Sequence, residues 1–145
     1  MSKIEIFYED IKPLLIRKTD IKKPVKYLIN KELNKLGEIS VILCSDSYLL
    51  DMNKQYLNHD YYTDIITFDY VENNIISGDL FISVDRVKEN AVKFESEFKK
   101  ELFRVVIHGV LHLIGYNDKT TEEQLIMREK ENLYLREVDF SEIEL

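Results

Sequence analysis

The feature that most constrains this chain is an apolar stretch near position 110 that contains two histidines. In "ELFRVVIHGVLHLIG", residues 101–115, apolar side chains surround the helical axis instead of forming one stripe. A helix of this kind needs other elements around it, so the stretch predicts a central, buried helix. His108 and His112 lie four residues apart and therefore project from the same face, one turn from each other.

Two interpretations of this histidine pair compete, a metal site and a pair of core histidines. Two neutral imidazoles buried together are costly, because each brings a donor and an acceptor that water no longer satisfies. Gly115 is suited to end the helix and let the chain turn back. Asp118 then falls at the spacing of the third ligand in extended zinc motifs. We therefore favour a metal site made of His108, His112 and Asp118.

Three protein ligands leave a fourth coordination position open, which is typical of catalytic zinc and indicates hydrolysis. Zinc peptidases carry a glutamate directly after the first histidine as the general base. This chain has Gly109 at that position. The pattern argues against a peptidase and leaves the general base unassigned.

The remaining pattern predicts an α+β fold. Short alternating or β-branched runs predict strands, and amphipathic segments with capping residues predict helices. The expected strands are 3–8, 38–44, 64–70 and 75–84, and the expected helices are 21–36, 46–57, 84–94, 98–114 and 121–137. Gly37 is expected to stop the first helix, and "VENN" to join the last two strands as a hairpin. We expect a mixed sheet of about four strands covered by about five helices, in a single domain over residues 1–145.

Charge and cysteine content bear on partners and location. The net charge of −7 argues at first against nucleic acid, but residues 120–145 hold 8 acidic and 3 basic side chains, whereas residues 11–35 hold 8 basic and 2 acidic ones. The basic segment is either an ordinary solvated helix face or a local basic surface that could serve a nucleic acid. Cys44, the single cysteine, lies in an apolar run and is expected in the core. With neither a signal peptide nor a membrane span in the sequence, we expect a cytoplasmic protein without a membrane partner.

Several motifs together resemble one known family. "HGVLHLIGYND" resembles the H-G-x-L-H-L-x-G-Y-D-H signature of the YbeY family, and "LDMNKQYLNHDYYTDIITFDY" and "SGDLFIS" are similar to two more of its segments. The resemblance covers about residues 37–135. It implies a single-strand-specific, zinc-dependent endoribonuclease in late maturation of small-subunit ribosomal RNA and in ribosome quality control. It also implies ribosomal RNA and the small subunit as partners, with a ribosomal protein or an assembly GTPase as further candidates.

The chain departs from the family pattern at the site. Asp118 replaces the usual third histidine. Zinc accepts a carboxylate ligand, but with this ligand another divalent transition metal could also occupy the site. Leu57 replaces an arginine that would suit a phosphate, and Asn117 replaces an aspartate. The residues that could instead contact substrate or support a ligand are Lys54, His59, Thr63, Asp64, Asp79 and Lys119.

These departures keep a second function open, that of a ribosome-assembly binding factor with a mainly structural metal and little or no cleavage. Leu57 and Gly109 favour the binding factor. The open coordination position favours the hydrolase.

Overall fold

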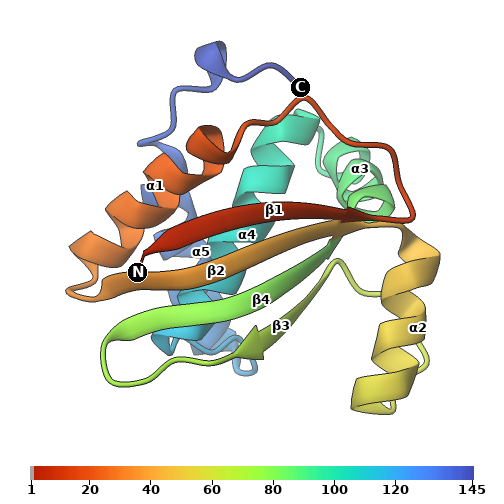
Figure 1. Ribbon diagram of the computed structural model, residues 1–145, viewed down its shortest axis with the longest axis horizontal. Helices are drawn as coiled ribbons and strands as arrows, with labels where there is room; N and C mark the ends of the chain where they lie inside the picture. The colour runs from red at the N-terminus through yellow and green to blue at the C-terminus, as the bar shows by residue number, and fades with distance from the viewer. Residues whose placement is uncertain (1) are drawn as a thin grey trace.

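Four strands form one mixed sheet in the computed structural model, which describes residues 2–145 (Figure 1). The strands are β1 (Lys3–Glu9), β2 (Lys35–Cys44), β3 (Ile65–Asp69) and β4 (Ile75–Ser83). Their order is β1-β2-β4-β3, in which β1, β2 and β4 run parallel and β3 pairs antiparallel with β4. The expected mixed four-stranded sheet and the expected hairpin are therefore confirmed.

Five helices cover this sheet unequally. They are α1 (Lys18–Lys31), α2 (Asp46–Leu57), α3 (Val84–Lys93), α4 (Phe98–Ile114) and α5 (Thr121–Leu135), and a short 3-10 turn follows at Phe140–Glu142. The main core lies between one face of the sheet and helices α1, α3, α4 and α5. A smaller cluster lies between the other face and α2, which stands apart from the other helices in Figure 1.

The central strand β2 is buried on both of its faces. Ile39, Val41 and Leu43 face the main core, while Cys44 belongs to the smaller cluster beneath α2. Burial and nearby carboxylates raise the pKa of the Cys44 thiol to about 12. The expectation of a core cysteine is confirmed.

The first helix differs from the prediction at both ends. It begins at Lys18 and ends at Lys31, because Leu33 adopts a left-handed conformation with φ of 63° and the chain then enters β2. Leu36 pairs with Ile76 in the sheet, so pairing between distant strands overrides the local helical pattern. The expected helix stop at Gly37 is wrong: this residue lies inside β2, where a Cβ would come within 2.1 Å of Ser77 Oγ.

The helix α4 is the buried central helix that the sequence predicts. It lies close against β3 and β4 because Gly109 faces them without a side chain. A Cβ on Gly109 would come within 2.7 Å of Ile65 Cδ1 and 2.9 Å of Leu80 Cδ2. This close approach fixes the half of α4 that carries both histidines against the sheet.

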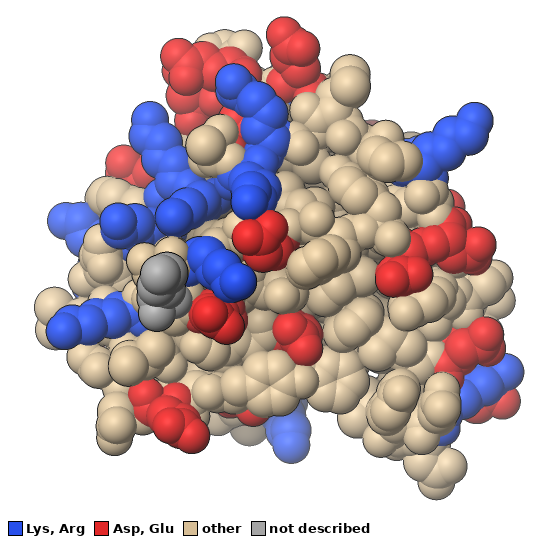
Figure 2. Space-filling model, viewed as in Figure 1, with Lys and Arg blue, Asp and Glu red and all other residues tan. Residues whose placement is uncertain are grey.

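Charged side chains are unevenly distributed over the face drawn in Figure 2. Lys and Arg gather on the side where α1 lies, which is the location of the basic segment 11–35 (Figure 2). Among residues 2–145, none of the helices has the length and apolar character needed to cross a membrane.

Candidate metal centre

Three side chains converge where α4 ends. The Nε2 atoms of His108 and His112 lie 3.0 Å apart on adjacent turns of α4. Gly115 then turns the chain with φ of 125°, and the following loop brings back Asp118. The Asp118 Oδ2 atom lies 3.3 Å from each Nε2 atom.

This arrangement fits a small divalent ion. Ligand atoms about 2.0–2.1 Å from a tetrahedral zinc lie about 3.3 Å from one another, close to the 3.0 and 3.3 Å between the donors here. Two imidazole nitrogens and one carboxylate oxygen suit zinc and related divalent metals. The three side chains are 23%, 28% and 39% exposed, so solvent and substrate can reach the side that they leave open. The residues His108, His112 and Asp118 could therefore hold a metal ion.

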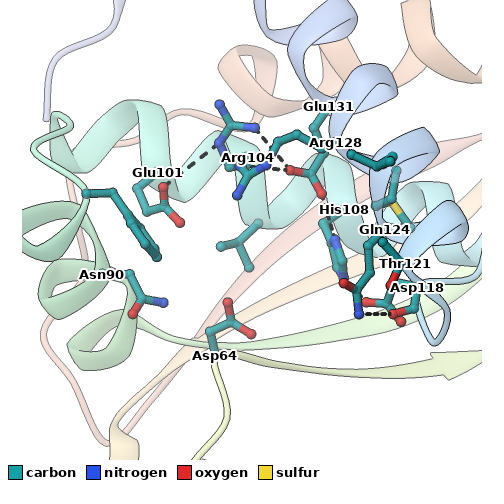
Figure 3. A pocket seen from close by; sticks show the side chains of 14 residues that line it. Asp64, Asn90, Glu101, Arg104, His108, Asp118, Thr121, Gln124, Arg128 and Glu131 are labelled. Carbon is teal, nitrogen blue, oxygen red and sulfur yellow. Dashed lines mark hydrogen bonds and ion pairs between the residues drawn. The ribbon is translucent and has the colours of Figure 1, made fainter.

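A buried carboxylate on α5 orients the first histidine. Glu131 Oε2 lies 2.8 Å from His108 Nδ1, and its other oxygen lies 3.0 Å from Arg104 Nη1 (Figure 3). A proton on His108 Nδ1 that is donated to Glu131 leaves Nε2 as the nitrogen that faces Asp118. The contact thus fixes both the ring orientation and the tautomer needed for ligation.

The pKa values of this pair shift in opposite directions. Burial tends to lower the pKa of His108, but the hydrogen bond and the charge of Glu131 raise it above its ordinary value. Burial tends to raise the pKa of Glu131, but His108 and Arg104 lower it. Glu131 is therefore held as a carboxylate behind the imidazole.

Glu131 is a site residue that the sequence analysis missed, although the sequence carries a signal for it. Met127, Glu131 and Tyr134 are the buried residues of α5, and their spacing of four and three places them on one face. Glu131 is thus a charged residue in the middle of a buried stripe. Arg104 similarly lies four residues before His108 on the same face of α4.

Two pockets meet at the three converging side chains. The first, of about 560 Å³, lies between α3, α4 and α5 and contains Arg104 and Arg128 (Figure 3). The second, of about 720 Å³, is lined by β3 and by the loop after α4. Asp64, His108 and Asp118 line both pockets. A ligand longer than either pocket could therefore extend past the cluster in two directions.

Three of the predicted substrate or supporting residues lie in these pockets. Thr63 and Lys119 line the second pocket, together with Leu57, and Asp64 lines both. Burial raises the pKa of Asp64, while the nearby His108 opposes that rise. Leu57 presents an apolar surface to the second pocket. The lysine that lines this pocket is Lys119.

The other three predicted residues, Lys54, His59 and Asp79, line neither of these pockets. Lys54 pairs with Asp60 at 3.4 Å. The ring of His59 stacks on that of Tyr61.

Asp79 accepts a hydrogen bond of 3.1 Å from the Tyr70 hydroxyl, in a pocket formed with α2 on the other face of the sheet. Glu131, and not Asp79, is the carboxylate in contact with Nδ1 of His108. The described residues of segment 11–35 line neither pocket at the cluster.

The position of a peptidase base is occupied by glycine. Gly109 directly follows His108, and a Cβ there would come within 2.7 Å of Ile65 Cδ1 and 2.9 Å of Leu80 Cδ2. A glutamate at this position would require the ends of these packed side chains to move. The packing therefore agrees with the sequence in arguing against the H-E-x-x-H mechanism.

The α+β fold, with an open cluster of two histidines from its central helix and an aspartate from the loop that follows, defines a class of enzyme in which a metal ion can assist hydrolysis. The family model described as endoribonuclease YbeY matches residues 7–139. The chain therefore belongs to the YbeY endoribonuclease family. The resemblance drawn from the motifs is confirmed, and so is the enzyme class that it implies.

Individual relatives agree with this assignment. A Parabacteroides distasonis protein named endoribonuclease YbeY is 51% identical over 129 residues, which are 89% of this chain and 91% of the relative. A Cytophaga hutchinsonii protein of the same name is 50% identical over 133 residues, 91% of this chain and 93% of the relative. A Thermotoga maritima protein with a known solution structure is 34% identical and superposes with a TM-score of 0.69, covering 96% of this chain and 90% of that one.

Proposed function

We propose that this protein is a zinc-dependent endoribonuclease that cleaves single-stranded RNA in late maturation of small-subunit ribosomal RNA and in ribosome quality control. It acts in the cytoplasm as a single domain, with ribosomal RNA as its substrate. The observation that carries the proposal is the convergence of His108, His112 and Asp118 on one open point where two pockets meet.

In this proposal the three side chains are the metal ligands. A bound zinc ion supplies Lewis acidity toward a phosphoryl oxygen and an acidified water. Glu131 holds the imidazole of His108 with Nε2 directed at the open point. Another divalent metal is an alternative occupant, because a carboxylate ligand favours harder ions than a third histidine does.

The two pockets support an unpaired strand as the substrate. A flexible strand can bring one phosphate to the cluster while its neighbours lie in the pockets on either side, whereas a stiff duplex cannot follow this path. Arg128, with a side chain 56% exposed, lines one pocket, and Lys119 lines the other. We assign contacts with the flanking phosphates to these two cations.

The test compares cleavage of a single-stranded RNA by the native protein, by Asp118→Ala and by Asp51→Ala, which removes an exposed carboxylate on α2. We expect Asp118→Ala to lose cleavage while its metal-free thermal midpoint stays near the native value. Asp51→Ala should cleave normally. Full cleavage by Asp118→Ala would refute the proposed ligand set.

The second candidate is an assembly factor that binds the small subunit through its RNA, a ribosomal protein or an assembly GTPase. The apolar side chain of Leu57 in the second pocket favours it, because leucine cannot hold a phosphate. An assembly factor should bind RNA and lose thermal stability when a chelator removes the metal, yet show little or no cleavage. An enzyme should cleave RNA and regain that activity when the metal is restored.

A further inference from the structure

The third proposed ligand depends on a loop, unlike the other two. His108 and His112 are held by α4, but Asp118 lies in the segment 115–120 between α4 and α5. Its side chain is 39% exposed. Whatever fixes this segment therefore determines whether the carboxylate stays near the imidazoles.

One end of the segment is held by the first turn of α5. Gln124 Nε2 donates a hydrogen bond of 3.0 Å to the backbone oxygen of Asp118. Glu123 Oε1 accepts hydrogen bonds from the backbone nitrogens of Lys119 and Thr120 at 3.1 and 2.9 Å. At the other end, the backbone nitrogens of Gly115 and Tyr116 donate to the backbone oxygen of Leu111 at 3.1 and 3.0 Å and so cap α4. These contacts fix the backbone at each helix end but do not connect the segment to α1.

A side chain at the beginning of the segment is also bound by Glu32, the residue that directly follows α1. The hydroxyl of Tyr116 donates to Glu32 Oε1. The other oxygen of Glu32 accepts from Lys130 Nζ at 3.1 Å and from the hydroxyl of Tyr134. We call these four residues the Glu32 cluster. None of them lines either pocket at the proposed metal site.

The Glu32 cluster connects the end of α1 with α5 and with the loop after α4. The Glu32 side chain is only 11% exposed, and a carboxylate in that position is tolerated because three donors satisfy it. Two donors come from α5, and the third comes from the loop, two residues before Asp118. The hydrogen bond from the Tyr116 hydroxyl thus ties the loop to the end of α1.

We infer that Glu32 and Tyr116 are positioning residues for the metal: their hydrogen bond holds segment 115–120 against α1, so that the Asp118 carboxylate is already placed for binding. The inference rests on the proposed function, because it takes Asp118 to be a ligand. Preorganisation of this kind raises metal affinity, since less loop entropy is lost on binding.

The cluster offers a matched pair of variants to test this role. Tyr116→Phe and Tyr134→Phe each delete one hydroxyl that donates to the same carboxylate, but only Tyr116 lies in the loop. Affinity for Co²⁺ is measured by competition with a chromophoric chelator, and the visible absorption of bound Co²⁺ reports its coordination. We expect Tyr116→Phe to bind Co²⁺ about tenfold more weakly with altered absorption, and Tyr134→Phe to stay within about twofold of the native protein.

The outcomes separate this inference from the proposed function. Native affinity in Tyr116→Phe, or equal weakening in both variants, would overturn the positioning role and leave the ligand set intact. A native protein that binds no Co²⁺ would overturn the ligand set and the inference together.

A second variant guards against a folding defect in Tyr116→Phe. Glu32→Met removes the acceptor at similar volume, and it should weaken Co²⁺ binding as Tyr116→Phe does. In the Glu32→Met background, Tyr116→Phe should cause no additional loss, because the hydrogen bond is already gone. An additive loss in the double variant would refute the proposed pairing.

Discussion

Glu131→Gln removes the charge behind His108 while it keeps the shape of the side chain. In the native protein the carboxylate contacts His108 Nδ1 at 2.8 Å and Arg104 Nη1 at 3.0 Å, and its side chain is only 7% exposed. Glutamine can still accept a hydrogen bond from His108 Nδ1 through its amide oxygen, but its NH2 group then faces Arg104 Nη1 and cannot accept from it. The substitution therefore keeps the hydrogen bond to His108 and removes both the negative charge and the contact with Arg104.

The expected magnitude follows from the change in hydrogen-bond type. A hydrogen bond to a charged group contributes about 1.5–3 kcal/mol, and a neutral one about 0.5–1.5 kcal/mol. Solvent screens this buried pair little, so the variant should lose about 1–1.5 kcal/mol of metal-binding free energy, or about tenfold in affinity. Such a loss lies at the lower end of the roughly 10–100-fold range for groups that orient metal ligands.

Zinc affinity, measured by chelator competition at constant pH, provides the assay. Glu129→Gln is the matched control, because Glu129 is exposed on the same helix and the charge change is identical. Unchanged affinity in Glu131→Gln would refute the orienting role. An equal loss in Glu129→Gln would show that overall charge, and not the contact with His108, controls binding.

Further predictions concern packing, reactivity, pH and RNA. Gly109→Ala should lower the thermal midpoint, because overpacking costs about 1–3 kcal/mol against roughly 1 kcal/mol gained in helix propensity; a rise would contradict the close packing of α4. Cys44 should react with iodoacetamide at pH 8 only after denaturation, as mass spectrometry can show, because it is buried and its pKa is about 12; labelling of the native protein would contradict this. Burial tends to raise the pKa of Glu32, but its hydrogen bonds lower it below the ordinary 4.5, so its stabilisation exists above that pH and is lost as pH falls further. Denaturant unfolding of Glu32→Gln should therefore differ from native most above pH 4.5 and converge with it in acid; a constant difference would contradict the shift. Lys119→Ala and Arg128→Ala should each weaken single-stranded RNA binding and reduce its salt slope by roughly 0.7, whereas an unchanged slope would exclude a phosphate contact.

The three converging side chains could be predicted because their geometry is local. Helical spacing puts His108 and His112 on one face, and a glycine at position 115 turns the chain back toward them. All of this occurs within 11 residues, so no distant contact was needed to bring Asp118 to the pair. Two-faced burial of β2 was also predictable, because its run of apolar residues fits only a central strand.

The features that could not be predicted from the sequence depend on contacts between distant elements. Glu131 meets His108 only because α5 packs along α4, and Glu32 meets Tyr116 across 84 residues. The end of α1 was misplaced for the same reason, since the pairing of Leu36 with Ile76 draws into β2 a segment whose local pattern suits a helix. Local periodicity contains no information on which distant element a segment will pair with or pack against.

One glycine links the packing of this fold to the chemistry open to it. Gly109 lets α4 approach β3 and β4 closely, and that approach fixes the two histidines against a rigid sheet. Glycine leaves this position, at which a zinc peptidase carries its glutamate base, without any side chain. A base on α4 next to His108 would have to displace the ends of the Ile65 and Leu80 side chains that pack there. Proton transfer in this enzyme must rely on groups outside that helical position, and Asp64 is a carboxylate that lines both pockets at the cluster.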